Sequence, residues 1–500
     1  MVRMRDSYNQ LSERFRRILV LGDAEAVLRW DQSVMMPGGG ASDRAEQVAV
    51  LETTQHGLLA APDMEELLDS AATEDLDEWR TANLAGMRRM WVHAAALPED
   101  LVAAKSHAAS ACEQIWRMAR AEADFQQVLP SLRTLLNLTR EGAAAKSEKL
   151  GVGLYDALLD EYEPDARSAD IDLLFEDLGG FLPDFLSRVL ERQAAEPPLL
   201  DLAGPFPVER QEALGRRLMS QLGFDFEHGR LDVSLHPFCG GTQGDVRLTT
   251  RYDPADFTSA LMGVLHETGH ALYEMGLPDA WRHQPVGGAM GMSIHESQSL
   301  LIEMQVCRSR DFLTYAAPVI ADELGGGGPA WDIDNLTRIY TRVKPDFIRV
   351  DADEVTYPAH VILRYELEKA LIQGSMDLAD LPEAWNDGLE RLLGIRPPND
   401  GLGCLQDIHW YDGAWGYFPT YTLGAMTAAQ LFAAAQQADT ELLAAIAQGD
   451  FVPLMTWLRA NVHGMGCSLS APDLLRQATG EPLSTTAFKR HLEARYLPSA

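Results

Sequence analysis

One short segment holds residues whose types and spacing could do chemistry. Residues 266–270 read His-Glu-Thr-Gly-His, an HExxH motif. On an α-helix, positions i and i+4 share one face, so both imidazoles can reach one zinc ion. Glu267 lies about 100° further around the helix, beside such an ion rather than on it. From there its carboxylate can take a proton from a water molecule, so the motif predicts metal-assisted hydrolysis.

The flanking residues predict a helix over 253–276 that would carry this motif. Asp253 suits the N-cap and Pro254 the first helical position, while Gly276 suits the C-terminal cap. Such punctuation favours a helical HExxH over a chance match.

A catalytic zinc site takes three protein ligands and keeps one open position. The third ligand must come from another element, because Glu274 only continues the same straight row. A second helix is expected over 293–310, and it offers Glu296 and Glu303. Ser293 and Glu296 also fit a capping box, which is the alternative explanation of Glu296. Spacing alone leaves Glu296, Glu303 and a more distant residue open.

The elements that must position these residues are mostly helical. Three-to-four periodicity of apolar residues predicts helices over 8–29, 99–148, 170–195, 208–222 and 426–495. The best strand-like segment is 231–252, where two short runs flank a glycine-rich turn at 240–244 and suggest a hairpin. We expect a single, mainly helical domain with a cleft.

Composition excludes several classes of protein. The 500 residues carry a net charge of −32, which disfavours binding to nucleic acid or to an anionic membrane surface. The five cysteines are scattered without a CxxC spacing, so we expect neither a disulfide framework nor a thiolate zinc site. The N-terminus lacks the apolar stretch of a secretory signal and no segment is apolar enough to span a membrane, so a cytoplasmic location is expected.

Several ordered motifs extend the pattern over nearly the whole chain, which resembles the thermostable carboxypeptidase Taq family of zinc metallocarboxypeptidases. Besides HExxH, the motifs are Trp30-Asp31-Gln32, His236-Pro237-Phe238, DVRLT at 245–249, HESQ at 295–298, IRVDAD at 348–353 and GCLQDIHW at 403–410.

The resemblance implies zinc ligands His266, His270 and Glu296, with Glu267 catalytic. It also implies a mainly α fold, with a small β-sheet beside a deep substrate groove, and a homodimer. We expect one domain over 1–500, with 1–205 forming one groove wall and 206–500 carrying the zinc site.

Hydrolysis of a peptide bond needs donors for the developing oxyanion. His409 and Tyr421 resemble the donor pair of related helical metallopeptidases, with Tyr417 as the substitute. Taken without the family, a tyrosine is more often a packing residue.

A carboxypeptidase must also bind a free C-terminal carboxylate, for which an arginine fork is suited. The candidates, in order of preference, are Arg349, Arg247 and Arg396. Arg247 and Asp245 could instead brace each other across the turn. His236 is a further substrate-binding candidate, although holding the hairpin against the HExxH helix is the preferred interpretation.

Two other features are interpreted as structural. Arg364, Glu366 and Glu368 follow Tyr357-Pro358 on a helix and are expected on a solvated or inter-helix face. Trp30 and its neighbours are expected to shape a wall of the groove.

The predicted function is a zinc-dependent carboxypeptidase acting on peptides with a free C-terminus, with one Zn²⁺ per chain and Co²⁺ or Mn²⁺ as possible substitutes. Two alternatives stay open: a zinc endo-oligopeptidase using the same site, and a non-catalytic, zinc-stabilised helical binding protein. Glu267 argues against the last, because a structural site has no need of a base.

Overall fold

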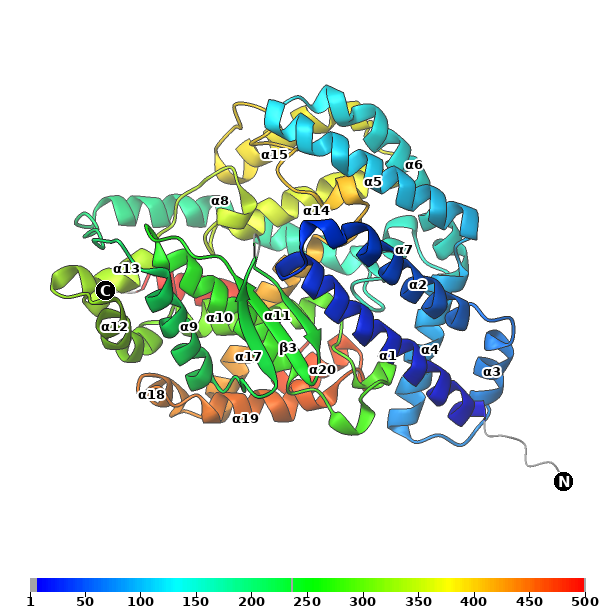
Figure 1. Cartoon of the computed structure of the whole chain (residues 1–500). Helices are drawn as coiled ribbons and strands as arrows, with labels where there is room; N and C mark the ends of the chain where they lie inside the picture. Colours follow the sequence, from blue (N-terminus) through cyan, green and yellow to red (C-terminus); the bar gives the residue numbers. More distant parts are fainter. Residues whose placement is uncertain (1–6, 235–236, 499–500) are drawn as a thin grey trace.

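The structure, a computed structural model, describes residues 7–234 and 237–498. In this part of the chain it is built mainly of helices, as predicted (Figure 1). The first half contains α1 (Ser7–Val34), α2 (Ala41–Leu59), α3 (Met64–Ala71), α4 (Glu78–Ala95), α5 (Glu99–Glu122), α6 (Phe125–Leu150), α7 (Leu154–Leu159), α8 (Ser168–Ala194) and α9 (Val208–Leu222). The second half contains α10 (Phe257–Glu274), α11 (Met292–Leu300), α12 (Arg310–Leu324), α13 (Ile333–Tyr340), α14 (Tyr357–Gln373), α15 (Leu381–Leu393), α16 (His409–Asp412), α17 (Pro419–Ala438), α18 (Leu442–Ile446), α19 (Val452–Asn461), α20 (Ala471–Thr479) and α21 (Thr486–Tyr496).

A small sheet lies against the HExxH helix. Its strands β1 (Gly229–Val233), β2 (Cys239–Thr242) and β3 (Asp245–Thr250) are ordered β1-β3-β2. β2 and β3 form an antiparallel hairpin, as predicted, but β2 lies almost wholly on the residues assigned to the turn at 240–244. The first predicted run instead contains most of β1, which pairs in parallel with β3. The sheet packs between α1 and α10, so it stands beside the HExxH motif (Figure 1).

Two large apolar cores hold the helices together. One core joins α5, α6 and α8 to α14, α15 and α21, and the other joins α9, α10 and α12 to the sheet. Helix α17 belongs to both, through Leu423 and Met426 on one side and Leu431 and Phe432 on the other. Tyr421 lies in the first turn of the same helix, so packing against both cores fixes the element that carries it.

The predicted helix over 99–148 is in fact two helices, α5 and α6. Ala123 adopts a left-handed φ of 54° at the end of α5, and the side chain of Asp124 accepts a hydrogen bond from the backbone N–H of Gln126. A left-handed residue followed by a capping aspartate stops one helix and starts the next.

The start of the HExxH helix also differs from the prediction. The N-cap of α10 is Asp256, whose side chain accepts from the backbone N–H of Thr258, and the helix ends at Glu274. Asp253 caps only the preceding turn, accepting from the backbone N–H of Ala255. Each aspartate accepts a hydrogen bond from the backbone N–H two residues further on, as a capping residue does. The helix itself begins only after the second of them.

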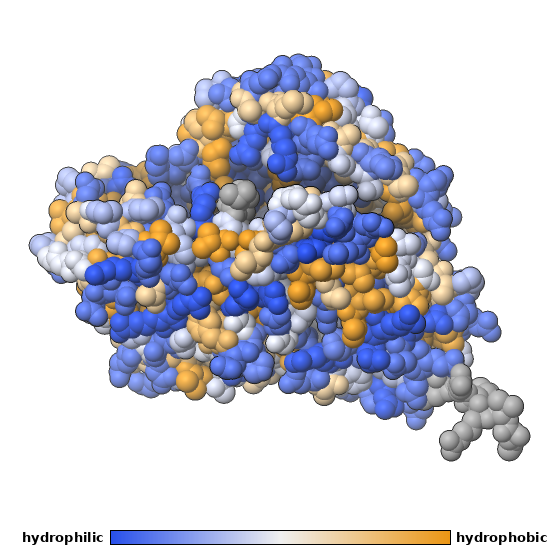
Figure 2. All heavy atoms as spheres, in the orientation of Figure 1, coloured by the Kyte–Doolittle hydropathy of each residue, from blue (hydrophilic) through white to orange (hydrophobic). Residues whose placement is uncertain are grey.

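Surface character agrees with the composition. Figure 2 shows a mostly hydrophilic face with dispersed apolar patches, hollowed between the upper helices and the central ones. Among the described helices, none combines the length and apolar character that crossing a membrane requires.

Candidate metal centre

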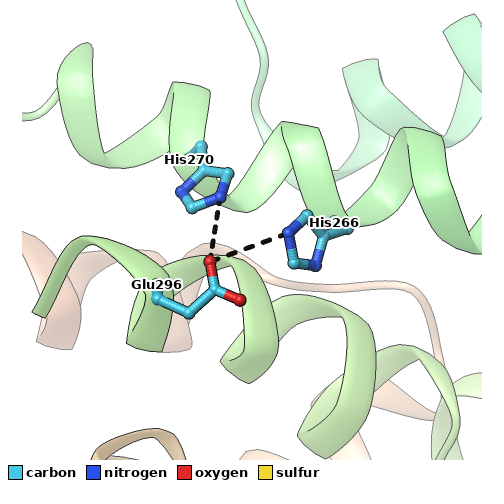
Figure 3. Close-up of side chains that lie close together, drawn as sticks. All are labelled: His266, His270 and Glu296. Atoms are coloured by element: carbon cyan, nitrogen blue, oxygen red, sulfur yellow. Dashed lines mark ion pairs between the residues drawn. The ribbon is translucent and has the colours of Figure 1, made fainter. Parts of the chain in front are cut away.

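Three side chains from two helices converge on one point (Figure 3). His266 and His270 project from α10, and Glu296 faces them from α11. Their potential ligand atoms all lie within 4.8 Å of one another. Oε2 of Glu296 is 3.4 Å from Nε2 of His270 and 3.9 Å from Nε2 of His266. Two imidazoles and one carboxylate are the donor set of a catalytic zinc site, so these residues fit such an ion.

The second nitrogen of each imidazole is already engaged. Nδ1 of His270 lies 3.1 Å from the carbonyl oxygen of His295 and therefore donates to it. Nδ1 of His266 lies 2.9 Å from Oε2 of Glu303. Partners at Nδ1 hold the proton there and leave Nε2 free to bind a metal, which is the arrangement that orients metal-binding histidines. Glu303, predicted as an alternative ligand, contacts the outer side of His266 instead.

Close packing between helices brings Glu296 into place. A Cβ atom on Gly269, inside the HExxH motif, would collide with the backbone oxygen of Gln298 on α11. A Cβ on Gly424 of α17 would stand 2.8 Å from Cγ of Glu296. Glycine at both positions lets α10 and α17 approach α11 from either side, so Glu296 has little freedom to move.

The alternative explanation of Ser293 and Glu296 as a capping box is wrong, because the N-cap of α11 is Gly291. The backbone N–H and the hydroxyl of Ser293 both donate to the carboxylate of Glu163, which lies in the loop after α7. A distant glutamate therefore caps α11, and Glu296 is released to face the histidines.

Glu267 is buried beside the triad. Burial is the main reason that its pKa is raised to about 7; His266 opposes this shift and Glu296 adds to it. Glu267 follows His266 directly on α10, and the charges of His266 and Glu296 both act on its carboxyl group.

Hydroxyl and imidazole groups gather at the start of α17, one turn before Gly424, which packs against Glu296. Nε2 of His409 lies 3.2 Å from the hydroxyl oxygen of Tyr421, and the ring of Tyr417 packs edge-on against Tyr421 at 5.2 Å. Burial, together with Arg349, lowers the pKa of His409 to about 4, so the imidazole is neutral near pH 7. Burial, opposed by Arg349 and reinforced by Glu296, raises the pKa of Tyr421 to about 12, so the tyrosine keeps its proton.

Arg349 lies 4.8 Å from the centroid of the Tyr421 ring and is part of a buried charge cluster. Its Nε and Nη2 donate to Oδ1 of Asp407 at 3.1 and 2.8 Å, and its Nη1 donates to the hydroxyl of Tyr357 at 2.9 Å. Nε of Arg364 donates to the other oxygen of Asp407 at 2.6 Å. Burial alone would raise the pKa of Asp407, but the two guanidinium groups outweigh it and hold this pKa well below its usual range. Two cations against one anion leave the cluster with a net positive charge.

The other candidate arginines have different surroundings. Arg247 pairs with Asp245 and lies 4.6 Å above the ring of Trp30, so the pair braces the hairpin and the early tryptophan packs on it. Arg396 lies on the surface and pairs with Glu383, Asp387 and Glu390 of α15. His236 lies outside the described residues.

Of the two positions left open for these charges, a solvated or an inter-helix face, Arg364 and Glu368 take the buried inter-helix one, whereas Glu366 is exposed and pairs with Arg391. Glu368 accepts hydrogen bonds from the hydroxyl of Tyr155 at 2.5 Å and from Nε1 of Trp410 at 3.0 Å. Sequence analysis missed this structural role, and it missed the capping role of Glu163. The sequence offered one signal for the buried partners: Asp407 and Trp410 belong to the motif at 403–410, and Glu368 follows Tyr357-Pro358 on the predicted helix.

A buried HExxH helix, a glutamate from a second helix and a mainly helical fold define the class of helical metallopeptidases. Comparison with known proteins gives the family. The model of the carboxypeptidase Taq (M32) metallopeptidase family matches residues 10–496. The chain belongs to this family.

Relatives match the chain over nearly its full length. Thermostable carboxypeptidase 1 of Thermus thermophilus is 37% identical over 502 residues, which cover 98% of both chains. Among solved structures, Trypanosoma cruzi metallocarboxypeptidase 1 superposes with a TM-score of 0.96 at 40% identity, covering 98% of this chain and 99% of that one. The M32 carboxypeptidase of Deinococcus radiodurans R1 has a TM-score of 0.93 at 34% identity, with 98% of each chain covered. The predicted family and fold class are confirmed.

Proposed function

We propose that this metallopeptidase is a zinc-dependent carboxypeptidase that removes residues from the free C-terminus of peptides. The observation that carries the proposal is the convergence of His266, His270 and Glu296 within 4.8 Å, beside a buried Glu267. We assign these three side chains as the ligands of one zinc ion per chain, with Co²⁺ or Mn²⁺ as substitutes.

A divalent ion in this position supplies a Lewis acid that polarises the scissile carbonyl and acidifies a water molecule. Glu267 takes the proton of the attacking water at its carboxylate and then delivers it to the leaving amine. Tyr421 donates its hydroxyl proton in a hydrogen bond to the developing oxyanion. Neutral His409, 3.2 Å from that hydroxyl, holds Tyr421 in place or acts as the second donor, and Tyr417 is the substitute.

Arg349 is our choice for binding the C-terminal carboxylate of the substrate. Of the five N–H donors of a guanidinium, three are used by Asp407 and Tyr357 in this structure. The remaining donors and the net positive charge of the cluster suit an incoming carboxylate. Arg247 and Arg396 already pair with acids, so they are weaker candidates.

We extend the proposal to the division of the chain, its location and its oligomeric state. Residues 1–205 form one wall of the substrate groove and residues 206–500 carry the zinc site. The enzyme works in the cytoplasm as a homodimer. Its net charge of −32 keeps it from nucleic acid.

A panel of matched peptides with free and amidated C-termini tests the proposal. We expect free peptides to be shortened one residue at a time, amidated peptides to be cut at least about tenfold more slowly, and a chelator to abolish both reactions. The loss of a charge-assisted hydrogen bond, about 1.5–3 kcal/mol, sets this minimum. Equal rates with internal cleavage would favour the zinc endo-oligopeptidase, and no cleavage of any peptide would favour the non-catalytic binding protein.

Replacing Arg349 by methionine tests the carboxylate anchor separately. We expect the KM of free peptides to rise about 10–100-fold, because a hydrogen bond to a charged group contributes about 1.5–3 kcal/mol. The preference for free over amidated peptides should disappear in the same variant. Arg310, which pairs with Asp334 on the surface, offers the control Arg310→Met. A retained preference in Arg349→Met would transfer the anchor to another group.

A further inference from the structure

The segment that follows Glu296 is wound as a π-helix. Residues Leu301–Cys307 continue directly from α11, and Glu303 lies within them. Such wider turns are rare and occur frequently at functional sites. The last carbonyl groups of any helix need hydrogen-bond donors from elsewhere.

Those donors come from the last helix of the chain. Arg495 of α21 extends its guanidinium to the carbonyl oxygens of Met304, 2.5 Å from Nη1, and Gln305, 3.2 Å from Nη2. One planar fork thereby bonds two successive carbonyl groups of the turn that carries Glu303.

Arg495 is itself held by a buried acid. Oε2 of Glu354 lies 2.9 Å from Nη1 of Arg495 and accepts the hydroxyl of Tyr496 at 3.0 Å, while Oε1 lies 2.7 Å from Nε2 of His491. The side chains of Arg495 and Glu354 are only 11% and 3% exposed. A guanidinium this buried, with its counter-ion fixed, has little freedom to leave the two carbonyls.

The same turn contacts the candidate metal ligand. Both oxygens of Glu303 are used, Oε2 by Nδ1 of His266 at 2.9 Å and Oε1 by Nη2 of Arg308 at 2.6 Å. A displacement of the π-helix would therefore move Glu303 away from His266 and release the imidazole ring.

We propose that Arg495 is a positioning residue of the metal centre, acting through the π-helix and Glu303 to hold His266 in the orientation that binds the ion. The proposal rests on the ligand set proposed above. It assigns to the C-terminal helix a role in metal affinity, some 190 residues along the chain from the π-helix that it contacts.

The test measures the Zn²⁺ and Co²⁺ dissociation constants of the full-length apoprotein by competition with a chromophoric chelator. We expect Arg495→Met to weaken both by about tenfold and to change the visible spectrum of bound Co²⁺, since it would loosen Glu303, and losing such an outer partner of a ligand outright typically costs 10–100-fold. Arg495→Lys, which keeps the charge beside Glu354 and one donor, should recover part of the affinity.

A matched control lies on the same helix. Lys489 pairs with Asp177 of α8 at 2.7 Å, so Lys489→Met weakens the attachment of α21 without touching the π-helix. Its metal affinity should equal that of the parent. Equal losses in the two variants would overturn the proposal and leave Arg495 as a general stabiliser of the fold.

A double-mutant cycle tests the route. If Arg495 acts through Glu303, Arg495→Met should weaken binding little further in a Glu303→Gln background. The proposal would be overturned if the losses of the two single variants add up in the double variant, or if Arg495→Met binds metal as tightly as the parent. If Arg495→Met does not fold, the same comparison is made with Arg495→Lys. Retention of zinc by Glu296→Ala would instead contradict the ligand set, so the two failures are distinguishable.

Discussion

Replacing Glu267 by glutamine is expected to lower kcat by about 10²–10⁴-fold, the usual contribution of a positioned general acid–base group. Glutamine keeps the size and polarity of the side chain but cannot take a proton from water. Because Glu267 is not one of the three residues whose ligand atoms converge, the variant should still bind one zinc ion per chain. Turnover of a free peptide and the zinc content of the same preparation are the two measurements.

The control is a glutamate outside the site. Glu366, an exposed residue of α14 that pairs with Arg391, offers Glu366→Gln, which should cleave peptides at the parental rate. Retained turnover in Glu267→Gln would contradict the proposed mechanism. Loss of zinc from that variant would mean that Glu267 helps to bind the ion.

The residues of the site that lie on one helix could be predicted from the sequence. His266, Glu267 and His270 depend only on helical periodicity, and α10 carries all three even though it begins later than predicted. His266 and His270 face Glu296 from this helix (Figure 3). The third metal ligand could not be predicted from spacing, which left Glu296, Glu303 and a more distant residue open; the family resemblance indicated Glu296. The close approach of α11 at Gly269 and Gly424 decides which oxygen meets Nε2, and such packing between helices is not visible in a single segment.

Helix α14 shows why the spacing of charges could not decide between a solvated and an inter-helix face. Arg364 and Glu368 are four residues apart, a spacing typical of charged pairs on a solvated helix surface. Both are fully buried in the structure, where Asp407 meets the first and Tyr155 and Trp410 meet the second. Because these partners lie at least 42 positions away along the chain, nothing within the helix indicates them.

The sheet illustrates the same limit. A hairpin is a local structure, so alternation and glycines predicted that one forms here and placed β3, but they put the turn where β2 lies. Strand β1 pairs in parallel with β3 through a connection that includes β2, and parallel pairing leaves no turn signal between the partners.

Replacing Glu296 by alanine is expected to weaken zinc binding by more than about 100-fold, the upper end of what losing an outer partner of a ligand costs. Its carboxylate is the one that faces Nε2 of both histidines, at 3.4 and 3.9 Å. Glu303 faces Nδ1 of His266 and cannot take its place without turning that ring, so Glu303→Gln should show only the milder loss, about 10–100-fold. Titration of both apoproteins with Zn²⁺ against a competing chelator measures the two effects side by side. Full zinc occupancy in Glu296→Ala would assign the third ligand elsewhere, and a larger loss in Glu303→Gln than in Glu296→Ala would make Glu303 that ligand.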